Sequence, residues 1–388
     1  MTPQVFYSVG ARLPGPGIGY TAYNALRAIH RRGMVAGISA MGYGACEVPA
    51  EKVRTIWFPS RRLLPLSLPR YYYLKDSYFD WRVSAYVRGG GGGGRLIFHG
   101  WAHQCLASMR RAKELGAVCF VERASSHPRT QLRLIQEEAD SLGLRGIGTP
   151  TYIVERMEEE FDLADRIMVP SQFAYDSMVG EGIAKEKLIV LPFGADTERF
   201  RPAERPSVGS QAGAARRDPF TILFVGELSL RKGAIYLLKA WLKVSVPRAR
   251  LVLLGAIEPQ LAGIVENFRR QRWFETPGFQ DPLPYYQGAS VFVFPTIEEG
   301  SALVTYEALA CGLPVITTFN SGSVVRDGVE GFIVPIRDAE AIVECIDRLA
   351  DEGRHREMSR AARERACEYT WDRYGDNLVS VYLSVLGG

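Results

Sequence analysis

The 388-residue sequence lacks the features that mark membrane-spanning, secreted and zinc-binding proteins. No apolar run approaches the ~20 residues that a membrane helix needs. The N-terminus has no basic start followed by a long apolar core, so we expect no signal peptide. The six cysteines are scattered, with no Cys-x-x-Cys pair, which is typical of a reducing cytoplasm and disfavours a zinc site. The sequence therefore predicts a cytoplasmic protein.

Length and composition are those of a globular protein with two domains of ordinary size, because 47% of the residues are hydrophobic and 23% are charged. The charge is uneven: residues 1–150 carry 20 Lys and Arg against 9 Asp and Glu, and the remainder carries 27 against 34. A basic half can attract anionic lipid, an acidic acceptor or nucleic acid, or it can be a solvated face. No recognisable motif supports nucleic-acid binding, so we expect no such partner.

The clearest local pattern lies in the C-terminal half. Residues 291–294 form a short apolar run that predicts a strand buried on both faces. A polar loop with two carboxylates follows, and residues 303–311 have the apolar spacing of a helix. Gly312 stands where a left-handed helix C-cap belongs, and Pro314 prevents the helix from continuing into a second predicted strand at 315–318.

This loop and the start of the predicted helix hold groups that can bind a phosphate and a hydroxyl. The N–H groups of Ser301, Ala302 and Leu303 lie at a helix N-terminus, where a phosphate can bind. Glu299 lies in the loop, and Glu307 lies eight positions further on, so one carboxylate can meet one end of a ligand while the other reaches a hydroxyl. The alternative is two surface glutamates on an ordinary αβ unit.

The stretch resembles the signature of the retaining glycosyltransferases of family 4. That signature runs Glu-Gly-(small)-x-Leu-x-x-x-Glu-Ala-x-Ala-x-Gly-x-Pro-Val, and it is matched by Glu299, Gly300, Leu303, Glu307, Ala308, Ala310, Gly312, Pro314 and Val315. The resemblance implies an α/β protein of GT-B architecture, with two doubly wound Rossmann-like domains facing across a cleft. It also implies an enzyme that moves a sugar, with retention, from a nucleotide-diphosphate sugar to a hydroxyl acceptor that is a glycan, a lipid-linked molecule or a small molecule.

The resemblance implies roles for both carboxylates and for a set of donor-binding residues. Glu299 would steady the sugar as positive charge develops at its anomeric carbon, without acting as a covalent nucleophile, and Glu307 would bind the ribose hydroxyls. Backbone near Phe279 would meet the base, where side chains do not distinguish UDP, GDP and ADP. The remaining donor-binding residues would be Gly19, Gly226, Gly300, Ser301, Ala302 and Leu303.

A basic loop lies between a predicted strand at 221–225 and the next helix. Its Arg231 and Lys232, together with a helix N-terminus, can neutralise a diphosphate leaving group. The family usually has an arginine where Glu227 stands, and our hypothesis is that Arg231 replaces it. Because the chain also lacks an Asp-x-Asp motif, we expect transfer without a metal ion or any other cofactor. The alternative is a basic loop that binds no ligand.

The N-terminal half also has loops that follow predicted strands. A glycine-rich loop after the strand at 5–9 contains Gly17 and Gly19, and allows close approach to a phosphate or a sugar. The loop at 123–129 resembles the family position where a histidine approaches the donor sugar, which implies that role for His127. At the ends of other strands, His99 and His103 are weaker candidates.

The predicted domains are residues 1–200 on the acceptor side and residues 219–370 on the nucleotide-sugar side, joined by a linker at 201–218. The resemblance implies that a C-terminal helix at 371–388 packs back on the first domain. Residues 56–75 mix arginines, aromatics and leucines, which is compatible with peripheral membrane contact, although their prolines exclude one long amphipathic helix. The six glycines of 89–94 predict a flexible loop without a function.

Two other functions remain open from the sequence. A nucleotide-sugar-binding module that has weak or no transfer activity is motivated by Glu227. A sugar-nucleotide epimerase would use the same fold. Turnover of a donor separates an enzyme from a binding module, and release of free nucleotide only when an acceptor is added favours a transferase.

Overall fold

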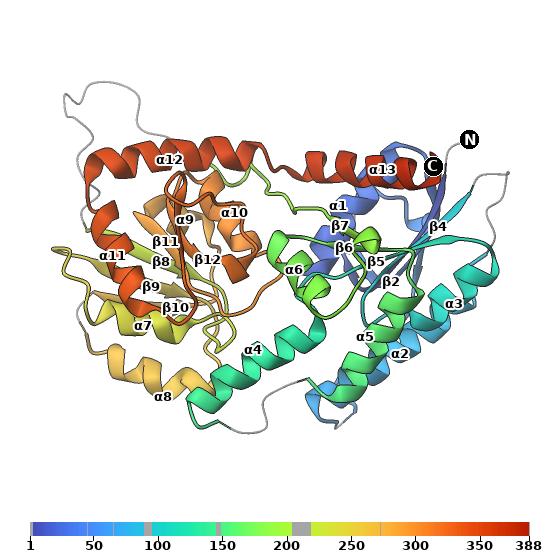
Figure 1. The fold of residues 1–388 in the computed structure, drawn as a ribbon, viewed down its shortest axis with the longest axis horizontal. Helices are drawn as coiled ribbons and strands as arrows, with labels where there is room; N and C mark the ends of the chain where they lie inside the picture. Colours follow the sequence, from blue (N-terminus) through green and yellow to red (C-terminus); the bar gives the residue numbers. More distant parts are fainter. Residues whose placement is uncertain are drawn as a thin grey trace. The chain divides into compact units, whose positions relative to one another are not determined.

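The computed structural model describes residues 3–44, 46–64, 66–88, 95–144, 149–203, 219–271 and 273–387. The described chain forms two compact units, shown in Figure 1. Unit 1 consists of Met1–Leu132, Gly148–Pro192 and Trp371–Gly388, and unit 2 consists of Arg133–Ile147 and Phe193–Thr370. The six-glycine run at 89–94 and residues 204–218 of the predicted linker lie outside the described residues.

Unit 1 is built on a seven-stranded parallel sheet in the order β3-β2-β1-β4-β5-β6-β7. Its strands are β1 (Gln4–Leu13), β2 (Val35–Tyr43), β3 (Val53–Thr55), β4 (Leu96–Trp101), β5 (Val118–Glu122), β6 (Arg166–Val169) and β7 (Leu188–Val190). Its helices are α1 (Ile18–Arg31), α2 (Leu68–Ser84), α3 (Leu106–Glu114), the start of α4 (Pro128–Ser141), α5 (Thr151–Leu163), α6 (Gln172–Gly180) and α13 (Trp371–Gly387).

Unit 2 is built on a six-stranded parallel sheet in the order β10-β9-β8-β11-β12-β13. Its strands are β8 (Thr221–Val225), β9 (Arg250–Leu254), β10 (Phe274–Gly278), β11 (Val291–Phe294), β12 (Val315–Thr318) and β13 (Gly331–Val334). Its helices, besides the end of α4, are α7 (Ala234–Trp241), α8 (Pro259–Phe268), α9 (Leu283–Gly288), α10 (Leu303–Ala310), α11 (Ala339–Leu349) and α12 (Glu352–Cys367).

Both sheets have the strand order of a doubly wound Rossmann-like fold, in which the chain reverses direction across the sheet after the third strand. The predicted α/β class with two such sheets is therefore confirmed. The central strands are largely apolar because helices cover both faces of a parallel sheet, and β11, for example, is completely buried. None of the helices in the described parts of the chain is long and apolar enough to cross a membrane.

The C-terminal helix α13 belongs to unit 1, where it packs along α1. The two helices approach closely at Gly375, where an added Cβ would lie 2.5 Å from the Cβ of Ala28. Buried hydroxyls of α13 reach the sheet: Tyr374 donates to Glu122 at 3.2 Å, and Tyr382 lies 2.6 Å from Nδ1 of His99. A polar network thus joins the C-terminal helix to the centre of the unit 1 sheet.

The sequence prediction for His99 is wrong. The strand that was expected to end at this histidine continues to Trp101, so His99 lies inside β4 and is completely buried. Its Nδ1 contacts Tyr382, and its Nε2 lies 3.1 Å from Glu122. Both ring nitrogens are therefore engaged within unit 1, and His99 is a core residue.

Two local features of unit 1 are less evident from the sequence. Residues 188–190 form β7, the last strand of the unit 1 sheet. The arginine- and aromatic-rich residues 56–75 include only the start of the 17-residue helix α2, which begins at Leu68. Pro69 is tolerated there because it lies in the first turn, where a missing N–H costs no helical hydrogen bond.

Candidate active site

The candidate site of unit 2 is built from the loops that follow β8 and β11. These two strands are neighbours at the centre of the sheet, where the strand order reverses. Ligands of open α/β sheets bind at this point, beyond the carboxyl ends of the strands. The loop at 226–233 follows β8 and the loop at 295–302 follows β11. The topology therefore brings together the two segments that the sequence analysis singled out.

Gly233 lets these two loops pack against each other. It has a left-handed φ of 65°, and a Cβ there would overlap the carbonyl oxygen of Pro295. Two residues before Gly233, the carbonyl of Arg231 accepts hydrogen bonds from the N–H of Ile297 and from Oγ1 of Thr296, both at 2.9 Å. Close backbone approach thus places the charged side chains of one loop beside those of the other.

We predict that Gly233→Ala lowers the free energy of unfolding by about 3 kcal/mol, because it adds both positive-φ strain and a clash with Pro295. Urea unfolding of the full chain measures this change. The control is Gly263→Ala, on an exposed face of α8 with no atom within 4 Å of the added Cβ, which should leave stability unchanged or slightly higher. Equal stability of wild type and Gly233→Ala would contradict the close approach.

The two loops form a cluster of two cations and two carboxylates. Arg231 lies 3.0 Å from Oε1 of Glu299 and 3.3 Å from Oε2 of Glu298. Lys232 pairs with the second oxygen of Glu299. Glu298 is completely buried, whereas the other three side chains are partly exposed. The predicted Arg231, Lys232 and Glu299 are therefore in direct contact, and Glu298 is a member that the sequence analysis missed.

Burial and pairing act in opposite directions on the two cations. Burial alone lowers the pKa of Arg231, but the carboxylates of Glu299 and Glu298 outweigh it, so the net pKa is raised. For Lys232 burial dominates and lowers the pKa, although Glu299 acts in the opposite direction. Lys232 is consequently a poorly hydrated cation whose charge depends on Glu299, and it gains from a second anionic partner.

Glu307 lies in α10, and its carboxyl group is hydrogen-bonded to Tyr286 and not to a member of this cluster. The hydroxyl of the buried Tyr286 donates to Oε2 of Glu307 at 3.0 Å. Burial raises the pKa of Glu307 to about 7, against an opposing effect of the Tyr286 hydrogen bond. Glu307 was predicted from the sequence, whereas Tyr286, which orients its carboxyl group, was not.

The N-terminus of α10 offers fewer amides than predicted. The N–H of Ala302 donates to the carbonyl of Ser321 at 3.0 Å, so its assignment as a phosphate donor is wrong for this conformation. Among the described residues, no backbone hydrogen bond engages the N–H groups of Ser301 and Leu303. The Ser301 hydroxyl donates to the carbonyl of Gly322 at 3.0 Å, which orients the end of the loop.

The other predicted residues of unit 2 lie around these loops. Gly226 follows β8 with a φ of 138°, and Gly255 approaches it so closely that a Cβ on Gly255 would overlap the Gly226 carbonyl. Gly300 lies in the loop before α10. Phe279 follows β10 with 90% of its side chain exposed, which leaves its ring free to contact a ligand. Glu227, where the family usually has arginine, is exposed.

Gly19 and His127 belong to unit 1. Gly19 lies in the first turn of α1, where a Cβ would overlap the carbonyl oxygen of Arg12. His127 precedes α4 and has only 1% exposure, with its ring 5.7 Å from that of Phe161. Burial lowers the pKa of His127 to about 4, so it is a neutral imidazole near pH 7. Their roles toward a donor stay predictions.

His103 lies just beyond β4, with a strained φ of 80°. Its Nδ1 is 2.8 Å from Oδ2 of Asp76, a buried residue of α2. Burial raises the pKa of the neighbouring Glu160 to about 8. His103 was a candidate from the sequence, but its carboxylate neighbours have no local sequence signal, because they come from α2 and α5.

These sheets and loops define a protein with two Rossmann-like units, one of which has a charged site at its switch point. Residues 219–352 match the model of the family described as "Glycosyl transferases group 1". Over that region the chain is similar to the group 1 glycosyltransferases, the class that the resemblance implied.

Two known relatives match part of the chain. The chain is 30% identical over 239 residues to a D-inositol 3-phosphate glycosyltransferase of Saccharomonospora viridis, covering 56% of this chain and 55% of the relative. It is 31% identical over 248 residues to D-inositol 3-phosphate glycosyltransferase 1 of Catenulispora acidiphila, covering 58% of each. The matches thus span little more than half the length of these relatives.

The fold is that of GT-B proteins over the whole chain. Sucrose-phosphate synthase of Thermosynechococcus elongatus has a TM-score of 0.73 at 20% identity, with all of both chains covered. Anabaena HepE in complex with UDP has a TM-score of 0.67 at 14% identity, covering 98% of this chain and all of HepE. At these identities the comparison establishes the GT-B fold.

Proposed function

We propose that the protein is a glycosyltransferase that uses a nucleotide-diphosphate sugar as its donor. The observation that carries the proposal is the contact of Arg231 and Lys232 with Glu299 at the switch point of unit 2. The match of residues 219–352 to the group 1 glycosyltransferase model supports it, as do the solved structures of Anabaena HepE with UDP and with UDP-glucose.

Charge on the departing diphosphate would be met by Arg231 and Lys232. Both cations already lie beside carboxylates, so a diphosphate would exchange part of that pairing for its own oxygens. The exchange favours Lys232 most, because its burial penalises the charge that a second anion would stabilise. Cations held in a partly buried site act most strongly where negative charge develops, which is at the leaving group.

Glu299 would stabilise positive charge at the anomeric carbon without bonding to it. One of its oxygens is held by Arg231 and the other by Lys232, which leaves a weak nucleophile. We propose front-face attack by the acceptor hydroxyl with retention of configuration. Proton NMR of the freshly formed product reads the anomeric configuration, and a glycosyl adduct trapped on Glu299 would overturn this mechanism.

Transfer is proposed to need no metal ion, because Arg231 and Lys232 can supply the two positive charges that a diphosphate requires. Dialysis against EDTA should leave kcat/KM within about twofold of its starting value. Loss of activity that returns with Mg²⁺ or Mn²⁺ would instead show that the two side chains are insufficient.

Donor affinity is predicted to rise with pH as Glu307 ionises. The ribose hydroxyls would donate to its carboxylate, and its pKa of about 7 leaves much of it protonated at pH 6. Binding of the ionised form releases a proton, so the Kd of a nucleotide sugar should fall by up to about tenfold between pH 6 and pH 8. Calorimetric titration at several pH values measures this, since the diphosphate diester of a nucleotide sugar does not titrate in that range. Glu307→Gln should bind weakly with a flat profile, whereas an unchanged slope in that variant would exclude Glu307 as its source.

The acceptor is proposed to be a hydroxyl-bearing carbohydrate or polyol. Two of the relatives carry the name D-inositol 3-phosphate glycosyltransferase, so a phosphorylated cyclitol is the first acceptor to test. Glycan and lipid-linked acceptors remain in the same test panel. The assay measures release of free nucleoside diphosphate and formation of the glycosylated product.

One experiment separates the transferase from its alternatives. UDP-, GDP- and ADP-sugars are screened by thermal shift, and the donor that stabilises most is incubated with and without acceptor. A transferase releases nucleotide chiefly when the acceptor is present. A binding module, the alternative that Glu227 suggests, is stabilised by the donor but does not turn it over. An epimerase converts the sugar without releasing nucleotide. Either of the last two results would contradict the proposed function.

A second proposal concerns location: a cytoplasmic protein with peripheral membrane contact through unit 1. Residues 57–81 hold six of the 13 exposed large hydrophobic side chains of the described chain: Trp57, Leu63, Leu68, Tyr72, Leu74 and Trp81. The exposed Arg61, Arg62 and Arg70 lie in the same segment. Exposed apolar side chains among cations fit an anionic bilayer surface.

Co-sedimentation with vesicles tests this contact. Vesicles with about one third anionic lipid should bind the wild-type chain, and purely zwitterionic vesicles should bind it more weakly. The double variant Trp57→Ser with Trp81→Ser should lower vesicle binding by roughly tenfold, because it removes two large side chains with 72% and 62% exposure. Equal binding of the double variant, or no binding of wild type, would contradict the proposal.

A further inference from the structure

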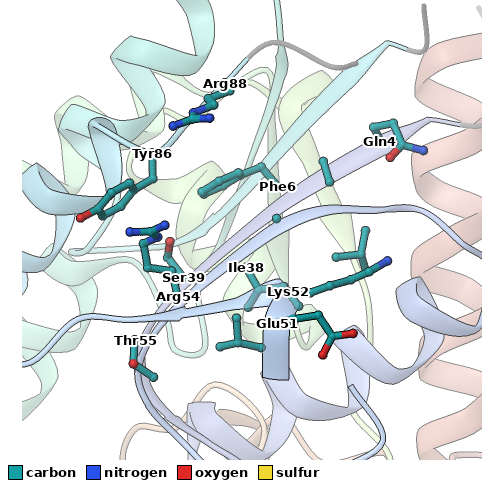
Figure 2. Close-up of a pocket in the computed structure, with 14 residues that line it drawn as sticks. Gln4, Phe6, Ile38, Ser39, Glu51, Lys52, Arg54, Thr55, Tyr86 and Arg88 are labelled. Carbon is teal, nitrogen blue, oxygen red and sulfur yellow. The ribbon is translucent and has the colours of Figure 1, made fainter. Parts of the chain in front are cut away.

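A cavity of about 700 Å³ lies in unit 1 (Figure 2), and none of its lining residues belongs to the charged cluster proposed for the donor. It is lined by the amino-terminal parts of β1 and β2, by β3 and by the segment that follows α2. Ligands of the doubly wound sheet are expected at the opposite, carboxyl ends of the strands. The transferase chemistry described above therefore does not account for this cavity, whose size is that of a small-molecule site.

A buried hydroxyl without a partner lies in the lining. Ser39 of β2 is completely buried, and its Oγ has no hydrogen-bond partner among the described residues. Ser39 is the register partner of Arg54 on β3. A buried hydroxyl normally has a partner, because an unmade hydrogen bond costs about 1–3 kcal/mol. Ser39 is thus a donor to a group that a ligand can supply.

The charge of the lining is positive. Lys52, Arg54 and Arg88 all line the cavity and are exposed, and none of them forms an ion pair with a described residue. Glu51 is the one carboxylate among the lining residues that the structure describes. These three cations form a surface that attracts an anion of small size.

The Tyr86 ring packs against Arg54, one of these three cations. The guanidinium carbon of Arg54 lies 4.1 Å from the centroid of the Tyr86 ring, and Arg82 donates to the Tyr86 hydroxyl at 2.9 Å. The Tyr86 side chain restricts the arginine, and a guanidinium with five N–H donors can still bind a further acceptor. At the floor, Gly37 adjoins Phe6, where an added Cβ would lie 3.0 Å from the ring. The lining thus combines cations with an apolar floor.

We propose that this cavity binds a small organic anion, whose phosphate or carboxylate is held by Arg54, Lys52 and the Ser39 hydroxyl and whose uncharged part lies against Phe6. An anion would neutralise the unpaired cations and accept the hydrogen bond that Ser39 lacks. Neutralisation of the cations and the hydrogen bond to Ser39 do not depend on the proposed transferase activity. The site lies in unit 1 and shares no lining residue with the charged cluster of unit 2.

The test is calorimetric titration of the full chain with glucose 6-phosphate, gluconate and inorganic phosphate, with glucose as the uncharged match. We expect at least one organic anion to bind, and glucose not to bind. A preference for glucose 6-phosphate identifies a phosphate ligand, and a preference for gluconate identifies a carboxylate ligand. Hydrogen–deuterium exchange should then slow in residues 51–56 when the anion is present. Absence of binding by all three anions, or binding of phosphate alone with no change in those residues, would overturn the proposal.

Variants separate this site from the donor site. Arg54→Glu should weaken anion binding by at least roughly tenfold. Ser39→Ala should weaken it by roughly three- to tenfold without loss of thermal stability, because the hydroxyl that it removes has no partner. Lys232→Ala should leave the exchange protection of residues 51–56 unchanged. If Lys232→Ala abolishes anion binding while Arg54→Glu does not, the anion occupies the donor site and the proposed cavity site is wrong.

Discussion

Replacement of Lys232 by alanine is expected to lower kcat/KM for the nucleotide sugar by roughly 10²- to 10³-fold, the usual effect of removing one charge-stabilising group from a transition state. Lys232 is a partly buried cation that pairs with Glu299. Its charge would act on the diphosphate most strongly as the sugar departs. Most of the loss should therefore appear in kcat, with a smaller rise in KM.

The matched control is Lys239→Ala, which removes an exposed lysine from the adjacent helix α7. Its amine lies 5.0 Å from the Tyr236 ring centroid and makes no contact with the charged cluster. Activity of this variant should stay within about twofold of wild type. If Lys232→Ala is equally active, the diphosphate does not meet Lys232. Steady-state kinetics with the preferred donor supply both values.

Replacement of Glu299 by glutamine is expected to lower kcat by roughly 10²-fold, because an amide cannot stabilise the positive charge at the anomeric carbon. The same change removes the carboxylate that raises the pKa of Lys232, so that pKa should fall further below its usual value. The alkaline limb of the pH–activity profile should consequently move to lower pH, which a purely structural role of Glu299 would not produce.

An exposed glutamate provides the comparison for this substitution. Glu357→Gln, on α12, alters the same functional group without touching the cluster and should behave as wild type. Circular dichroism and thermal unfolding establish that Glu299→Gln is folded. A folded Glu299→Gln variant with wild-type kcat and an unmoved alkaline limb would remove Glu299 from the mechanism.

Much of unit 2 was predictable because its local signals agree with one another. The strands at 291–294 and 315–318 have the predicted bounds, and α10 ends one residue earlier than expected. Gly312 has the predicted left-handed conformation, with a φ of 72°. Apolar runs, a helical period and a glycine cap all describe the same strand–loop–helix–strand unit, so the sequence alone determined it.

The side-chain contacts of the predicted residues were harder to predict from the sequence. Glu298 and Glu299 are adjacent in a polar loop, and only the packing of that loop shows that both carboxylates meet Arg231, 67 and 68 positions away. Tyr286 was visible as part of an aromatic pair, but nothing local indicates that its hydroxyl reaches Glu307. Contacts between loops depend on strand order, which a single sequence does not supply.

His99 shows how an error in strand length changes a functional prediction. A strand that ends at His99 would present the ring to ligands, whereas the observed β4 continues for two more residues and buries it against Tyr382. The burial partner comes from α13, 283 positions along the chain. Element boundaries are the least certain part of a sequence prediction, and at this position two residues decide between a site and a core.

The most direct test of the proposed function compares a nucleoside diphosphate with the monophosphate of the same base, by calorimetric titration of wild type and Lys232→Ala at pH 8. If Arg231 and Lys232 hold the diphosphate, wild type should bind the diphosphate at least roughly tenfold more tightly, a difference of about 1.4 kcal/mol. Lys232→Ala should lose most of that preference. Equal affinity of wild type for both nucleotides, or the same preference in both proteins, would contradict the assignment of this cluster as the diphosphate site.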